Sequence, residues 1–169
     1  MALIVEDGSG ILGADSYSTL EEARAYALSR GLVLPELDTL AEVQLRVAFD
    51  YIESLGSRYT GQRTLAAQIT QWPRKYVYID CAELDPAIVP LAVKQAQVHL
   101  AAAIQSGVNL FAVSDGSAAI VREKVGEIET EYKVSAGSSS ATYARVIAAD
   151  RLLSPLLRDG GMSVTVQRV

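Results

Sequence analysis

Several residue types that build catalytic and metal sites are nearly absent from this chain. Its 169 residues include one cysteine, Cys81, and one histidine, His99. A lone cysteine excludes an intrachain disulfide and fits folding in a reducing compartment. These two residues cannot form a two-histidine or histidine–cysteine metal site. No serine, cysteine or lysine stands in a recognisable nucleophile motif. We therefore expect a protein that is not an enzyme and has no metal site.

Excess positive charge and long apolar runs are also missing. The net charge is -5 and the pI is near 4.9, whereas proteins that hold DNA by its phosphates need a basic surface. The longest apolar runs, such as Leu100–Ile104, are too short to span a membrane, and the first residues lack the basic start of a signal peptide. We expect no membrane partner. The hydrophobic content of 50% is ample for one globular core.

Helical signals dominate the first two thirds of the chain. Ser18 with Glu21, and Thr39 with Glu42, have the spacing of a capping box at a helix start. The first helix should end at Gly31 and the second at Gly56. Between the second helix and the third, only residues 65–70 suggest a further short helix. The apolar face of the second helix is formed by Leu45, Ala48, Ile52 and Leu55.

Two later segments complete a predicted bundle of about four helices. One opens at Asp85-Pro86, carries Pro90 in its first turn and ends at Gly107. The other runs from about Thr142 to Leu153, and Pro155 kinks or ends it. The buried stripe of the third helix should consist of Val93, Ala96, Leu100 and Ala103. A short strand is expected at residues 2–5. The fold class is therefore mainly α.

A β-hairpin is predicted at about residues 120–134, inserted between the third and fourth helices. With Gly126-Glu127 as a two-residue turn, Val125 faces Ile128 on one side of the hairpin. The same register gives opposite-charge pairs on the other side. These pairs are Lys124 with Glu129 and Arg122 with Glu131.

The end of the chain reads as an extended tail. Gly160-Gly161 releases it from the last helix, and apolar residues then alternate with polar ones. We expect one helical domain, residues 1–161, followed by the tail, residues 162–169. The candidate partner-binding residues in the tail are Met162, Val164, Val166, Arg168 and Val169.

The segment Gly8-Ser9-Gly10-Ile11-Leu12-Gly13 has the glycine spacing of a dinucleotide-binding loop. That function requires a helix starting at the loop, so that its amides meet the pyrophosphate. Here the first helix begins several residues later and no parallel βαβ unit follows. The pattern therefore does not indicate a cofactor, and we expect none.

Aromatic and basic residues gather in segment 58–78. They permit two interpretations: a platform on which single-stranded DNA stacks, or an aromatic cap over the helix bundle with arginines at its rim. We favour the cap. The residues that a DNA-binding module would use are Arg58, Tyr59, Arg63, Trp72, Arg74 and Lys75.

Several segments, taken in order, resemble one family of small tailed-bacteriophage proteins that are encoded beside head genes. These proteins are often labelled DnaT-like single-stranded DNA-binding proteins, and the pattern is similar to the head–tail connector, or adaptor, fold. Asp15 stands where the family pattern has Asn. The segments are Val5-Glu6-Asp7-Gly8-x-Gly10, Ala14-Asp15-Ser16-Tyr17, Ala25-Tyr26 before Gly31, Arg58-Tyr59-x-Gly61, Gln71-Trp72-Pro73-Arg74, Pro86-x-x-Val89-Pro90-x-Ala92-Val93-Lys94, Glu123-Lys124-Val125-Gly126 and Leu152-Leu153-Ser154-Pro155-Leu156-Leu157.

The resemblance implies a structural virion protein. Adaptors of this kind form rings, usually of twelve copies, beneath the portal; they extend the DNA channel and receive the next neck or tail component. The implied partners are the portal protein, neighbouring copies, a downstream neck protein and packaged DNA that passes without sequence-specific binding. The implied location is the virion neck, with assembly in the host cytoplasm. The hairpin would then line the channel or a ring interface through Arg122, Lys124, Glu127, Glu129 and Glu131.

Overall fold

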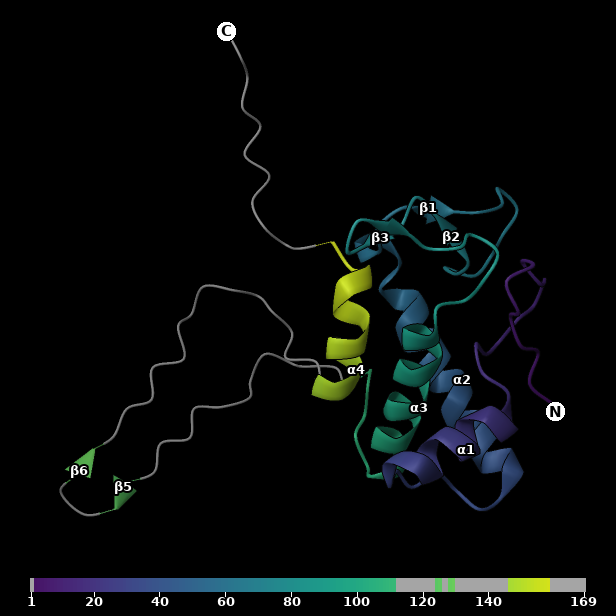
Figure 1. Cartoon of the computed structure of the whole chain (residues 1–169). Helices are drawn as coiled ribbons and strands as arrows, with labels where there is room; N and C mark the ends of the chain where they lie inside the picture. Colours follow the sequence, from purple (N-terminus) through teal and green to yellow (C-terminus); the bar gives the residue numbers. More distant parts are fainter. Residues whose placement is uncertain (1, 112–123, 126–127, 130–145, 159–169) are drawn as a thin grey trace, which may run out of the picture.

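The computed structural model describes residues 2–111, 124–125, 128–129 and 146–158. In this part of the chain four α-helices dominate, which confirms the mainly α prediction. They are α1 (Leu20–Arg30), α2 (Asp38–Ser54), α3 (Leu91–Gln105) and α4 (Ile147–Leu153). Helices α2, α3 and α4 stand side by side, α1 crosses one end of them, and the segment that holds strands β1–β4 covers the other end (Figure 1).

The core lies between the helices and beneath the β1–β4 segment. Leu45 and Ile52 on α2, Leu100 on α3 and Leu153 on α4 are fully or almost fully buried. Each such side chain contributes about 1.5–3 kcal/mol to stability by leaving water. The predicted apolar face of α2 is confirmed at Leu45, Ala48 and Ile52, and the stripe of α3 is confirmed at Val93, Ala96 and Leu100. Leu55 and Ala103 are only half-buried.

Helix α1 begins one residue later than predicted. Its capping box joins Thr19 and Glu22: the Glu22 amide donates to Thr19 Oγ1 at 3.0 Å, and the Thr19 amide donates to Glu22 Oε2 at 3.1 Å. The sequence Ser-Thr-Leu-Glu-Glu offers two boxes with the same spacing. Ser18 is buried instead, at 2% exposure. The helix ends at Gly31 as predicted, with φ of 67° in the left-handed region.

Helix α2 begins without the predicted capping box of Thr39 and Glu42. Its N-cap is Leu37, whose side chain makes no capping bond. The guanidinium of Arg24, on α1, fixes this start instead. It donates to the Glu36 carbonyl at 2.7 Å and pairs with the Asp38 carboxylate at 2.7 Å. The predicted start of the third helix at Asp85-Pro86 is wrong, because α3 begins at Leu91. Its N-cap is Pro90, which lies just before the first turn in which it was expected.

Segment 56–83 is more ordered than the sequence indicates. A 3₁₀ turn, η1 (Gly56–Arg58), follows α2. Two short antiparallel hairpins come next. The predicted helix at residues 65–70 is wrong: this stretch is turn and bend, and the amide of Gln68 holds it by donating to the carbonyls of Thr70 and Pro73. The hairpins pair β1 (Gln62–Arg63) with β2 (Arg74–Lys75) and β3 (Tyr78–Ile79) with β4 (Ala82–Glu83).

The C-terminal end of the described body lies beside η1. A second 3₁₀ turn, η2 (Ser154–Leu156), follows α4 and contains Pro155, so α4 ends there as predicted. The Arg158 amide then donates to the Arg58 carbonyl at 2.7 Å. At the other end, the strand expected at residues 2–5 is wrong in extent, because only an isolated bridge joins Val5 to Ser16.

Two residue pairs of the predicted hairpin at 120–134 are described. Strand β5 (Lys124–Val125) pairs antiparallel with β6 (Ile128–Glu129), and Lys124 lies opposite Glu129 while Val125 lies opposite Ile128. This is the predicted register. Arg122, Glu127 and Glu131 lie outside the described residues. So do linker 135–140, the start of the last helix near Thr142, the domain boundary at 161 and the whole of tail 162–169.

Candidate functional surfaces

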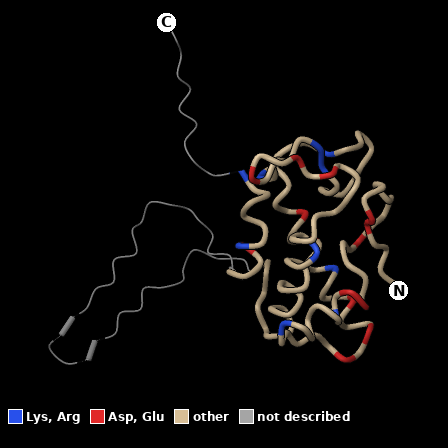
Figure 2. The backbone as a smooth tube through the Cα atoms, viewed as in Figure 1, with Lys and Arg blue, Asp and Glu red and all other residues tan. Residues whose placement is uncertain are grey.

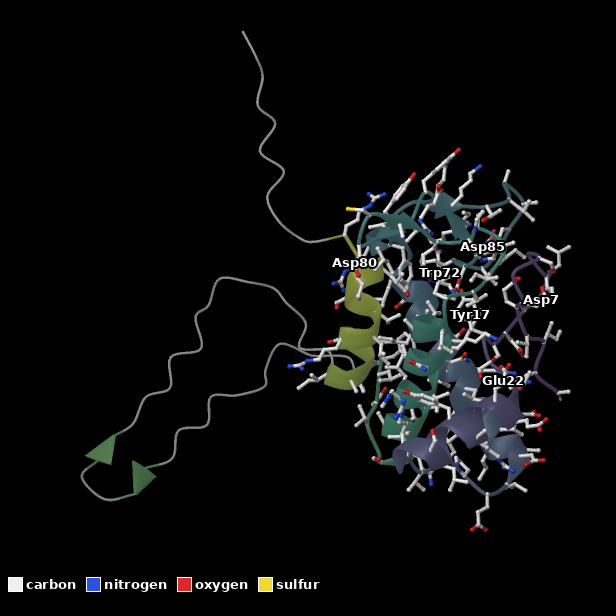
Figure 3. The ribbon with its side chains drawn as sticks, in the orientation of Figure 1. Asp7, Tyr17, Glu22, Trp72, Asp80 and Asp85 are labelled. Atoms are coloured by element: carbon white, nitrogen blue, oxygen red, sulfur yellow. The ribbon has the colours of Figure 1, made fainter. Side chains whose placement is uncertain are left out.

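The aromatic centre of segment 58–78 is enclosed by the protein. Trp72 is 1% exposed and Tyr59 is 0% exposed. Their rings meet edge to face, with centroids 5.4 Å apart. Trp72 lies where the β1–β4 segment meets the helices (Figure 3). Because a stacking platform must offer its ring faces to bases, these two residues cannot form one in this fold. The aromatic cap is the interpretation that the structure supports.

A buried polar network holds this cap on α2. The Tyr17 hydroxyl donates to the Glu53 carboxylate, which also accepts the Gln71 amide at 2.9 Å. The Trp72 amide donates to the Tyr17 oxygen at 3.2 Å. Burial raises the pKa of Glu53, against the opposing effect of its hydrogen bonds to Tyr17 and Gln71. Burial also raises the pKa of Tyr17 well above its ordinary value, and the Glu53 charge adds to the shift.

Arg74 is a structural residue of the cap. It is 6% exposed, and its guanidinium donates to the carbonyls of Thr60 at 2.8 Å, Gly61 at 3.0 Å and Gln71 at 3.3 Å. Burial lowers the pKa of Arg74, and the neighbouring positive charge of Arg63 lowers it further. These bonds fix the loop that carries the β1–β2 hairpin. They leave the guanidinium little freedom to bind a phosphate.

The rest of the predicted DNA-binding set lies at the surface. Arg58 and Arg63 are exposed and Lys75 is half-buried. Tyr76 and Tyr78, which are not among the six predicted residues, are 55% and 57% exposed. We call these five residues the basic rim. Of the six predicted residues, the structure therefore leaves three in the basic rim and buries Tyr59, Trp72 and Arg74 in the body.

The loop with the glycine pattern holds an anion from its own chain. Glu6 is 0% exposed, and its carboxylate accepts the amides of Gly8, Gly10 and Ile11, each at 2.8 Å. The Thr70 hydroxyl approaches the same carboxylate at 3.5 Å. A concave set of backbone N–H groups is a typical anion-binding arrangement. Here the Glu6 carboxylate of the same chain occupies this arrangement.

A second buried polar residue that the sequence did not reveal is Gln97, in the centre of α3. Its side-chain amide donates to the Ser16 hydroxyl and to the Leu45 carbonyl, both at 2.9 Å. Its side-chain oxygen accepts the Tyr17 amide at 3.0 Å. Gln97 thus ties three segments together. The position of Gln97 beside the apolar stripe of α3 could have indicated this role, because a buried glutamine side chain needs hydrogen-bond partners.

Exposed apolar side chains concentrate where α1 turns into α2. Five large ones fall within residues 28–43, and each is at least half exposed. We call this set the α1–α2 apolar surface. Acidic residues gather around the same region, at the start of α1 and along the α1–α2 connection (Figure 2). The apolar surface consists of Leu28, Val33, Leu37, Leu40 and Val43.

Other candidate chemistry is sparse in the described part of the chain. His99 lies 3.3 Å from the Tyr26 hydroxyl, and burial followed by the charge of Arg30 lowers its pKa. Among the described residues, no group of three or more His, Cys, Asp or Glu could hold a metal ion. None of the described helices is both long enough and apolar enough to cross a membrane.

The described residues form a small, mainly α fold with an enclosed aromatic cap and an exposed apolar surface between α1 and α2. A family model described as "Putative DnaT-like ssDNA binding protein" matches residues 1–169, and the chain belongs to this family. The description names single-stranded DNA binding and no virion component. No curated protein and no solved structure matches the chain.

Proposed function

We propose that the protein is a structural subunit of a tailed-bacteriophage virion, a head–tail connector (adaptor). Twelve copies would form a ring beneath the portal, extend the DNA channel and receive the neck or tail-completion protein. Packaged DNA would pass without sequence-specific binding. The role is structural and not catalytic, carried out in the virion neck after assembly in the host cytoplasm. The proposal starts from the resemblance of nearly the whole chain to such adaptors.

The α1–α2 apolar surface is the observation that carries the proposal. Leu28 is 85% exposed and Val33 is 68% exposed, and neither belongs to the hydrophobic core or packs against it. Exposed apolar residues that gather in one region typically mark a surface that another protein covers. A closed ring is a head-to-tail assembly, so each subunit needs two different complementary surfaces. The α1–α2 apolar surface supplies one of them.

The experiment is reconstitution with the cognate portal protein. The purified chain and the portal should form a complex that migrates together in size-exclusion chromatography and shows a ring on the portal by electron microscopy. Leu37→Glu, in the α1–α2 apolar surface, should weaken assembly while leaving the melting temperature unchanged. Leu12→Glu is a matched control, because Leu12 is 71% exposed in a different region. Absence of a complex, together with absence of the protein from purified virions, would refute the proposal.

Single-stranded DNA binding is the second candidate, and the family description favours it. In this chain the basic rim would have to carry it. Lys75 Nζ lies 5.7 Å from the centre of the Tyr76 ring, so a cation and an exposed aromatic face are adjacent. Arg63 is exposed beside them on β1. Such a pair can hold a phosphate and a stacked base at the same time.

Fluorescence anisotropy with a labelled oligonucleotide separates the two functions. Binding through the basic rim should weaken about two- to tenfold for Arg63→Glu and should fall steeply as salt rises. Tyr76→Ala should reduce binding without unfolding the protein. Leu91→Glu, an exposed site on α3, is the control for an added negative charge. If none of these variants changes a measurable affinity, the basic rim is not the binding surface.

A further inference from the structure

A groove beside the α1–α2 apolar surface has the features of a site for an extended peptide. It is a shallow depression of about 550 Å³, wide open to solvent, which suits a chain lying along the surface. Arg24 joins α1 to the start of α2 beside the groove, through hydrogen bonds to the Pro35 and Glu36 carbonyls and an ion pair with Asp38. The groove is lined by Leu20, Glu21, Arg24, Ala25, Leu28 and Asp38.

The groove combines an apolar wall with an exposed negative charge, that of Glu21. Leu28, which belongs to this wall, is 85% exposed. At the rim, Asp38 is paired with Arg24, and the neighbouring Glu22 is paired with Lys94. Glu21 is exposed and has no ion pair within the described part of the chain. An occupant should therefore present apolar side chains and a cation.

The tail of residues 162–169 has this chemistry. Val164 and Val166 alternate with polar residues, so an extended chain turns both toward one side. Arg168 follows at the same spacing and supplies the cation. The tail also belongs to the part of the chain that continues beyond the last described residue, Arg158.

Chain length decides which copy supplies the tail. Arg158 is bonded to Arg58, just past the C-terminal end of α2, whereas the groove lies at the opposite end of α2, beside Asp38. A helix of 17 residues is about 25 Å long. Val164 is six residues beyond Arg158 and reaches at most about 20–22 Å when fully extended. Val166, eight residues beyond Arg158, reaches about 26–29 Å and only when every residue is fully extended. A tail therefore cannot lay both valines in the groove of its own chain.

We propose that the tail of one copy binds the α1–α2 groove of a second copy. The valines would cover the apolar wall at Leu28, and Arg168 would pair with Glu21. This contact joins two different surfaces, as a ring requires, and the inference therefore rests on the proposed function. It names the partner of the α1–α2 apolar surface, which is the tail of the next subunit.

Cross-linking between full-length chains tests the proposal directly. In a Cys81→Ser background, one protein carries Leu28→Cys and the other carries Val166→Cys. After mixing and mild oxidation, a disulfide-linked dimer of the two should form at least about tenfold faster than with Leu12→Cys as the partner, because formation requires the two cysteines to meet. Reversal of one charge, with Glu21→Arg, should slow the reaction about two- to fivefold. Adding Arg168→Glu on the other protein should restore it.

Two outcomes would overturn the inference. One is a cross-linking rate equal to that of the Leu12→Cys control. The other is a single chain carrying both Leu28→Cys and Val166→Cys that closes an internal disulfide at high dilution, which would place the tail on its own body. Ring formation on the portal without tail cross-linking would refute this contact and leave the proposed function intact. Tail cross-linking without any portal complex would support this contact and count against the proposed function.

Discussion

Replacing Trp72 with alanine tests whether this residue is a core anchor or a surface for stacking bases. The side chain is 1% exposed and packs edge to face on Tyr59. Truncating a buried tryptophan leaves a cavity as well as losing contacts, so Trp72→Ala should cost about 3–5 kcal/mol of unfolding free energy. For a domain of this size the melting temperature should fall by about 6–20 °C.

A second substitution at the same site makes the test more specific. Within the described residues, the indole N–H of Trp72 is buried and has no hydrogen-bond partner. Trp72→Phe keeps an aromatic ring for Tyr59 and removes that unpaired group, so it should cost only about 1–2 kcal/mol. Tyr78→Ala is the control from the basic rim. Tyr78 is 57% exposed, and its loss should change stability by less than about 0.5 kcal/mol.

The assay is guanidinium unfolding followed by far-UV circular dichroism, which does not depend on the removed fluorophore. The midpoint should fall while the slope stays the same, as expected when only native-state stability changes. Oligonucleotide affinity should be measured for the same proteins. If Trp72→Ala keeps the wild-type midpoint and loses oligonucleotide binding, the argument from burial is refuted.

Three further predictions concern the buried polar groups and the tail. Glu6→Ala should cost about 2–3 kcal/mol, because it leaves the loop amides without an acceptor, and limited proteolysis should then cut within residues 8–13. Burial raises the folded-state pKa of Glu53 above its unfolded value. The contribution of Glu53 to the unfolding free energy is therefore fully present below about pH 4.5 and is lost as pH rises through the raised pKa. Unfolding free energies measured from pH 4 to 8 should decline less with rising pH for Glu53→Gln than for the wild type. Deleting residues 162–169 should leave the melting temperature of the isolated chain unchanged and weaken attachment to the portal or to a second copy, as measured by co-sedimentation.

The helices were predictable where a single local pattern decides them. On α2, the spacing of Leu45, Ala48 and Ile52 gives only one face that can be buried, and Gly31 ends α1 because it adopts a left-handed conformation. The hairpin register was predictable for a similar reason, since Gly126-Glu127 as the turn fixes every pair that follows.

The predicted helix starts were wrong where two local capping signals were equivalent, or where a residue distant in sequence determined the start. Ser18 and Thr19 each have a glutamate three residues later, and only burial of Ser18 selects the second box. The start of α2 depends on Arg24, which lies eleven or more residues before the carbonyls that it contacts. No periodic sequence pattern predicts these hydrogen bonds. The hairpins β1–β2 and β3–β4 are two residues per strand, too short to give a strand signal.

The glycine loop shows why a sequence motif needs its surroundings before it indicates a ligand. Gly8 has φ of 112° and Gly10 has φ of 80°, conformations that turn successive amides toward one point. The same geometry would suit a phosphate. In this structure the Glu6 carboxylate lies at that point, and the hydroxyl of Thr70, which is distant in sequence, approaches the same carboxylate. A carboxylate two residues before such a loop can therefore occupy the loop's anion-binding position itself. Through Glu6 and Thr70, the loop is joined to the segment that forms the aromatic cap.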